Sequence, residues 1–97
     1  MPTYAWLQRF ANEFAKLDGD QKAAFIEAVR KFVEDLERGR GFRKGLRVKG
    51  IQGSSGIFEL TWAKDGRATF QYGPSQLPGE PHVIWRRIGT HSICDRP

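Results

Sequence analysis

Three side chains in the second half of the sequence could together catalyse phosphoryl transfer: Glu59, Arg67 and His91. A guanidinium presents two parallel donors that match a phosphate, and an imidazole titrates near pH 6.5, which suits proton transfer. A carboxylate can serve as a base. The set therefore contains what a phosphodiester needs to be cleaved by a neighbouring hydroxyl, as in RNA, without a metal ion.

Each of these residues also has a simpler interpretation. Glu59 and Arg67 are expected on adjacent strands facing the same side, so they could form a cross-strand ion pair and no more. His91 follows a predicted strand end and could be a solvated loop histidine. The sequence leaves both interpretations open, whereas the phosphate-binding interpretation of Arg67 is favoured.

Further basic residues could hold a nucleic-acid backbone. A basic run surrounds the aromatic Phe42, which could stack on a base; the run could equally dock an acidic protein segment. Arg86 and Arg87 are neighbours on a predicted strand, so regular alternation places only one of them on the polar face. The candidate backbone contacts are Lys44, Arg47, Lys49, Arg86 and Arg87.

Composition restricts the class of protein. The 97 residues suit one domain spanning residues 1–97, and no apolar run could cross a membrane. Residues 1–39 carry six basic and seven acidic groups, but residues 40–97 carry ten and four, which favours a surface facing a polyanion. Cys94 is the one cysteine, so we expect no disulfide, no zinc site, no cofactor and a cytoplasmic location.

The first 39 residues predict a helical hairpin. Leu7, Phe10, Phe14 and Leu17 recur at helical spacing. The segment 18–21 resembles a capping box for a second helix, which the glycines at 39 and 41 would end. The apolar positions of that second helix are Phe25, Val29, Phe32, Val33 and Leu36.

Residues 46–91 predict four strands. Alternation with period two begins at Leu46, and Asp65-Gly66 predicts a hairpin turn. The sequence therefore predicts an α+β fold, with the helical hairpin packed on one face of a four-stranded, mostly antiparallel sheet. In the last strand the inward set is left open between two regular alternatives. The other face is predicted to be polar, carrying Arg47, Lys49, Glu59, Thr61, Arg67, Thr69 and Gln71.

Four segments in this order resemble the RelE/ParE toxin superfamily. They are Leu46–Gly50 (LRVKG), Gly56–Leu60 (GIFEL), Asp65–Phe70 (DGRATF) and Ile84–His91 (IWRRIGTH). The helical hairpin before them fits as well, so the resemblance covers nearly the whole chain. Many members begin with a short extra strand, for which residues 2–5 are the candidate here.

The resemblance implies roles for particular residues. Arg67 matches the strand arginine that contacts the scissile phosphate in the nuclease branch, and His91 matches a catalytic basic or histidine position. The founding nuclease has lysines where this chain has Glu59 and Thr61, and its C-terminal catalytic tyrosine has no counterpart here. These departures imply a different base.

The resemblance implies the toxin of a bacterial toxin–antitoxin pair. In the RelE branch the toxin cleaves messenger RNA on the ribosome, so we expect an endoribonuclease whose partners are mRNA and a cognate antitoxin, with DNA contacted only through that antitoxin. Two alternatives remain: a ParE-like inhibitor of DNA gyrase without nuclease activity, for which His91 would be dispensable, and an inactive module that binds nucleic acid or antitoxin.

Overall fold

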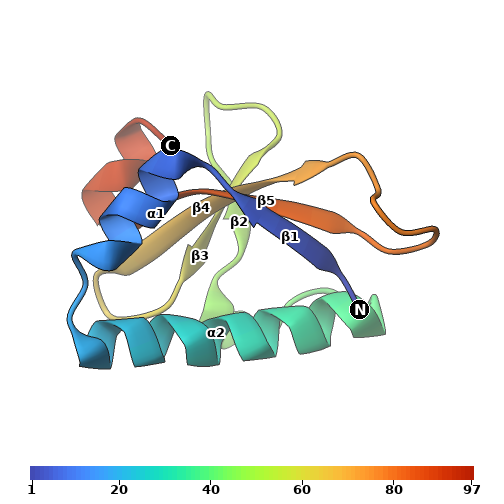
Figure 1. Ribbon diagram of the computed structural model, residues 1–97, viewed down its shortest axis with the longest axis horizontal. Coiled ribbons are helices and arrows are strands. Elements are labelled where there is room, and N and C mark those ends of the chain that lie inside the picture. Colours follow the sequence, from blue (N-terminus) through green and yellow to red (C-terminus); the bar gives the residue numbers. More distant parts are fainter.

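The computed structural model describes residues 1–97 and consists of two helices packed on a five-stranded sheet (Figure 1). The helices are α1 (Gln8–Ala15) and α2 (Gly19–Arg38). The strands are β1 (Thr3–Trp6), β2 (Lys49–Gly50), β3 (Ile57–Thr61), β4 (Gly66–Gly73) and β5 (His82–Thr90). Two short 3₁₀ helices complete the chain, η1 (Lys44–Leu46) and η2 (His91–Asp95). The predicted α+β class is confirmed.

The sheet has five strands rather than the four that periodicity predicts. Its order is β1-β5-β4-β3-β2, and β1 pairs in parallel with β5, Thr3 lying opposite His82. All other neighbours are antiparallel. A four-residue strand is too short to reveal itself by alternation, and here the extra strand covers the edge of β5.

The predicted strand from Leu46 is largely replaced by other structure. Residues Lys44–Leu46 form η1, and Arg47 adopts a left-handed conformation with φ of 47°. Only Lys49 and Gly50 pair with β3. The buried Leu46 side chain joins the core from this turn. The alternation of apolar Leu46 with polar Arg47 therefore does not indicate a strand here.

Helix α2 begins and ends where the sequence predicts. The Asp18 carboxylate accepts a hydrogen bond from the Gln21 backbone N–H at 2.8 Å, and the Gln21 side chain accepts one from the Asp18 N–H at 2.9 Å. Gly39 ends the helix with φ of 69°, in the left-handed region that favours glycine. The predicted capping box is confirmed.

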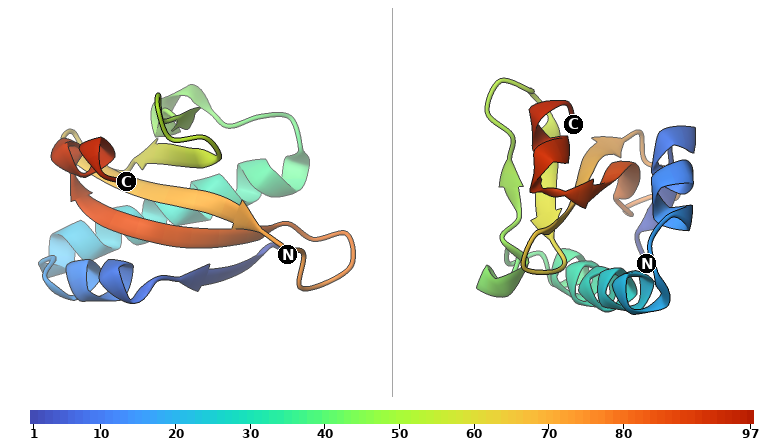
Figure 2. Two further views of the ribbon diagram at one scale, coloured as in Figure 1. Left: turned by 90° about the horizontal axis from the view of Figure 1, so that it is seen from above. Right: turned by 90° about the vertical axis from the view of Figure 1, so that its left-hand side faces the viewer.

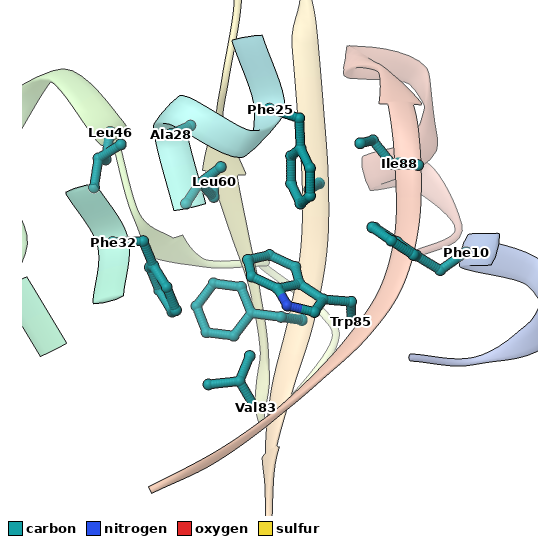
Figure 3. Close-up of a cluster of buried hydrophobic side chains, with 11 residues drawn as sticks. Phe10, Phe25, Ala28, Phe32, Leu46, Leu60, Val83, Trp85 and Ile88 are labelled. Carbon is teal, nitrogen blue, oxygen red and sulfur yellow. The ribbon is translucent and has the colours of Figure 1, made fainter. Parts of the chain in front are cut away.

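Aromatic side chains join both helices to one face of the sheet (Figure 3). Phe10 of α1 and Phe25 of α2 have ring centroids 6.1 and 5.4 Å from the ring of Trp85 in β5. Phe32 lies 5.0 Å from Phe70 in β4 and is 1% exposed. This cluster fixes α2 beneath the sheet and leaves the opposite face to η2 (Figures 1 and 2).

A β-bulge interrupts the alternation of β5. Phe70 pairs with Trp85 and Thr69 pairs with Arg87, so Arg86 is the extra residue. Val83, Trp85 and Ile88 are buried in the core, which is neither of the two regular inward sets. The bulge lets Arg86 and Arg87 both reach the C-terminal residues, although Arg87 also pairs with Glu13 of α1, at the edge of the helical layer. None of the helices is long and apolar enough to span a bilayer.

Candidate functional site

The predicted polar face is covered at its centre. Helix η2 folds back over β4 and β5, and beneath it Glu59 of β3 is 6% exposed and Thr69 of β4 is fully buried. Sequence periodicity predicts an open polar face, because it contains no signal that the five residues after β5 return onto the sheet. The covering helix brings new side chains to the predicted site.

Two side chains of η2 meet Glu59. His91 and Cys94 are three residues apart, and in a 3₁₀ helix residues at this spacing project from the same side. The ligand-type atoms of Glu59, His91 and Cys94 all lie within 4.8 Å of one another. His91 is exposed, Cys94 is half-buried and Glu59 is buried, so the group extends from solvent into the sheet.

The ion pair of Glu59 is with Lys49, not with Arg67. The register places Lys49 opposite Glu59, and the Lys49 Nζ is 3.8 Å from the Glu59 Oε1. Arg67 lies opposite Thr61, two pairs further along the β3–β4 hairpin than Glu59. The simpler interpretation of Glu59 as a partner for Arg67 is therefore wrong.

Arg67 is held at the β3–β4 turn by one nitrogen. Its Nη1 donates hydrogen bonds to the carbonyls of Gly66, Lys64 and Ala63 at 3.0, 3.3 and 3.4 Å. Its Nε is buried without a partner. The Nε and Nη2 donors form the side edge of a guanidinium that can grip a phosphate with two parallel hydrogen bonds, and here that edge is uncommitted.

Arg67 also lines a basic groove of about 660 Å³ between α2 and the β3–β4 turn. Four of the basic side chains that line this groove form no salt bridge: Lys31, Arg47, Lys64 and Arg67. Arg43 lines it too, but its guanidinium is bound to Asp35 at 2.8 Å and Glu34 at 2.9 Å. We call this surface the basic groove. Its unpaired cations give it a positive charge that favours anionic ligands.

The structure brings together some of the residues predicted to contact a nucleic-acid backbone and separates others. Arg47 lies in the basic groove with Arg67, whereas Lys49 is drawn to Glu59 and Lys44 is exposed on η1 outside the lining. Lys31 and Lys64 are groove residues that sequence reasoning missed. Lys31 belongs to the solvent face of a helix and Lys64 to a turn, so no local pattern connects them.

Arg86 and Arg87 hold the C-terminal segment in place. Arg86 donates to the Gln71 side chain and to the Pro97 carbonyl. Arg87 donates to the Arg96 carbonyl at 3.3 Å and forms an ion pair with Glu13 of α1 at 2.5 Å. Both side chains are occupied within the chain, and their position keeps η2 over the site.

The Cys94 thiol is unsuited to nucleophilic attack. Burial raises its pKa to about 11, and the neighbouring Glu59 carboxylate contributes in the same direction because it disfavours a second negative charge. A thiol in this state is overwhelmingly protonated near neutral pH. The sequence-based expectation that Cys94 has no catalytic role agrees with this environment.

A second concavity is apolar. It has a volume of about 470 Å³ and lies between β1, α1 and α2. Tyr4, Trp6 and Ile26 line it and are 64%, 53% and 58% exposed. The rings of Tyr4 and Trp6 stack with centroids 5.6 Å apart. We call this surface the apolar groove; exposed clusters of large apolar side chains commonly mark a protein interface.

Solved structures share this fold. The chain is similar to a copper-bound mutant toxin from Helicobacter pylori (14% identity, TM-score 0.63, 95% of this chain and 97% of that one). It is also similar to the YoeB/ParE toxin from Agrobacterium tumefaciens (11%, 0.65, 92% and 98%). A third likeness is to the E. coli DinJ–YafQ toxin–antitoxin complex (12%, 0.64, 94% and 93%).

No family model and no curated protein matches the sequence. The structural likenesses confirm at the level of fold the resemblance seen in the sequence. The protein has the α+β fold of the RelE/ParE toxins.

Proposed function

We propose that this protein is the toxin of a toxin–antitoxin pair and acts as an endoribonuclease on ribosome-bound messenger RNA. The observation that carries the proposal is the position of Arg67. Its guanidinium lines the basic groove, and Arg67 pairs with Gly89 of β5, two residues before His91. An RNA backbone along the groove would bring a phosphate to a proton-transfer group.

The reaction needs no cofactor in this scheme. His91 accepts the proton of the 2′-hydroxyl, and the 2′-oxygen attacks the adjacent phosphorus. The bond from phosphorus to the 5′-oxygen breaks, and that oxygen takes a proton from solvent. The products are a 2′,3′-cyclic phosphate and a 5′-hydroxyl. Arg67 stabilises the negative charge that develops on the oxygens of the pentavalent phosphorus. Electrostatic stabilisation of this kind is usually the largest single contribution to catalysis.

Glu59 acts through His91 in this scheme. It is buried, and its carboxylate lies within 4.8 Å of the imidazole nitrogen, so it stabilises the imidazolium that proton transfer creates. The sequence also makes Glu59 a candidate base. Because η2 covers it, the exposed His91 has the better access to a 2′-hydroxyl.

The apolar groove supports the antitoxin half of the proposal. An amphipathic segment of an antitoxin would bury Tyr4, Trp6 and Ile26 between β1 and the helices. The DinJ–YafQ neighbour is itself a toxin–antitoxin complex. The groove is separate from Arg67 and His91, so partner binding and cleavage can be tested independently.

The nuclease proposal predicts that single substitutions at the site abolish cleavage in a folded protein. We expect His91→Ala and Arg67→Ala each to lower the cleavage rate by about 100-fold or more. The measurement is induced expression with transcript 5′ ends mapped and DNA breaks scored in the same cells. Matched controls are His82→Ala, at the far end of β5, and Arg9→Ala, exposed on α1.

The outcomes separate the alternatives. New transcript ends that the site variants lose and the controls keep support the nuclease. DNA breaks without transcript cleavage would instead indicate a gyrase inhibitor. A folded protein that produces neither signal and no growth defect would contradict both toxin mechanisms and leave a binding module.

A further inference from the structure

The Glu59–His91–Cys94 group has the composition of a metal site. A carboxylate, an imidazole and a thiol are three ligand types that Zn²⁺ accepts, and three protein ligands plus one water is a common arrangement for this ion. Residues far apart in the sequence supply them, Glu59 from β3 and the other two from η2. None of the function proposed above uses the thiol.

The geometry suits a tetrahedral ion. Zinc bonds of ~2.0–2.3 Å separate the ligand atoms of a tetrahedral site by roughly 3.2–3.7 Å. In this structure the three ligand atoms lie within 4.8 Å of one another. Side-chain rotation can shorten these separations, because His91 and Cys94 project from one side of η2 and already lie near Glu59.

The surroundings favour a cation at this point. The closest cation to the buried Glu59 carboxylate is the Lys49 ammonium at 3.8 Å, beyond hydrogen-bond distance, and the Lys49 side chain is 69% exposed. Thr69 lies directly opposite Glu59 in the register, and its buried hydroxyl has no hydrogen-bond partner. A buried hydroxyl next to a ligating carboxylate is the kind of outer group that orients metal ligands.

We propose that Glu59, His91 and Cys94 bind one zinc ion, and that the bound ion inhibits RNA cleavage. Binding releases the thiol proton to solvent and forms bonds from zinc to sulfur, nitrogen and oxygen, with no redox change. The bound ion occupies the imidazole nitrogen that would accept the 2′-hydroxyl proton. The inhibitory half rests on the nuclease function proposed above, but the binding half does not.

Cobalt(II) provides a direct test of binding on the full chain without RNA. It replaces zinc in tetrahedral sites, and a cysteine ligand adds a thiolate-to-cobalt absorption in the near ultraviolet. We expect one Co²⁺ per chain with this absorption, and competition by Zn²⁺. Cys94→Ser should remove the absorption, and Cys94→Ser and Glu59→Gln should each weaken binding by at least about 10–100-fold.

Two variants serve as matched controls. His82→Ala removes the other histidine, which contacts Thr3, and Asp95→Asn removes a carboxylate of η2 outside the group. Both should bind Co²⁺ as the unchanged protein does. Circular dichroism and thermal unfolding show whether each variant is folded, and the isosteric Glu59→Gln provides a second route if Cys94→Ser is unstable.

Cleavage of RNA with and without equimolar Zn²⁺ tests the inhibitory half. We expect Zn²⁺ to reduce the rate of the unchanged protein but not that of Cys94→Ser. Co²⁺ binding without any RNA cleavage would retain the metal site and overturn the nuclease proposal. Cleavage without thiolate–cobalt absorption would overturn the metal site alone, as would absorption that survives Glu59→Gln at full affinity.

Discussion

At the scale of single residues, the guanidinium of Arg67 is divided between two tasks. Nη1 is fixed by three carbonyls of the β3–β4 turn, while the buried Nε lacks a partner. A buried donor without an acceptor is costly, and an incoming phosphate oxygen would relieve that cost. A lysine has no fork with which to bond the turn and a phosphate together, so the proposed role is specific to arginine.

This division predicts the result of Arg67→Lys. If the side edge grips the phosphate, the lysine variant should lose nearly as much cleavage as Arg67→Ala, about 100-fold, although the charge is kept. The measurement is the cleavage rate of purified variants on one RNA, and Arg47→Lys provides the comparison in the same groove. Full activity of Arg67→Lys would mean that charge alone is required.

At the scale of elements, the segment after α2 is fixed by one buried carboxylate. Asp35 accepts hydrogen bonds from the Arg43 backbone and guanidinium, at 2.8 to 2.9 Å, and is 6% exposed. This contact fixes the chain that leads into η1 and to Arg47 of the basic groove. The Arg43 side-chain and backbone hydrogen bonds lower the pKa of Asp35 from 3.8 to about 2.

The lowered pKa predicts how stability depends on pH. Asp35 binds a proton less readily in the folded protein than in the unfolded chain. The Asp35–Arg43 contact therefore stabilises the folded state fully when the pH is above the ordinary pKa of the carboxyl group. The stabilisation is lost as pH falls from about 4 through about 2. Asp35→Asn should lower Tm at neutral pH by several degrees, and the difference from the unchanged protein should shrink below pH 4.

Thermal unfolding between pH 7 and pH 3 measures this difference. Glu37→Gln is the matched control, because Glu37 is an exposed acid of the same helix. A Tm difference for Asp35→Asn that stays constant down to pH 3 would show that the carboxylate charge does not stabilise the segment.

At the scale of the whole molecule, α2 separates the apolar groove from the basic groove. Ile26, Val29 and Val33 face the apolar groove, whereas Glu27 and Lys31 face the basic groove. A partner covering the first surface therefore lies along the helix that borders the second. Under the proposed function, an antitoxin in the apolar groove would have a route to influence RNA binding without contacting His91.

The two surfaces predict separable variants. Trp6→Glu should weaken binding of the antitoxin, because it places a charge in the apolar groove, and should leave RNA cleavage unchanged. Leu77→Glu is the matched control, since Leu77 is also 53% exposed but lies outside both grooves. The measurement is co-purification with a candidate antitoxin expressed in the same cells, together with rescue of growth by that antitoxin.

A loss of cleavage together with partner binding in Trp6→Glu would contradict the separation of the surfaces. Equal loss of partner binding in Leu77→Glu would show that the effect is not specific to the apolar groove.

Contacts between residues close in the chain could be predicted from the amino-acid sequence alone. Helical spacing and the Asp18–Gln21 capping box set the second helix. The Asp65-Gly66 turn set the β3–β4 register, which places Glu59, Thr61 and Arg67 on one face. Each of these follows from contacts between residues close in the chain, so local propensity is sufficient to predict them.

Contacts between residues far apart in the chain became visible only in the folded protein. The parallel pairing of β1 with β5 joins residues 79 apart, Thr3 and His82. The bulge at Arg86 directs two arginines to the C-terminal segment, and η2 then carries His91 and Cys94 to Glu59. The basic groove likewise unites Lys31 with Arg67. Such contacts depend on how helices and sheet pack as whole bodies, and no short-range pattern encodes that packing.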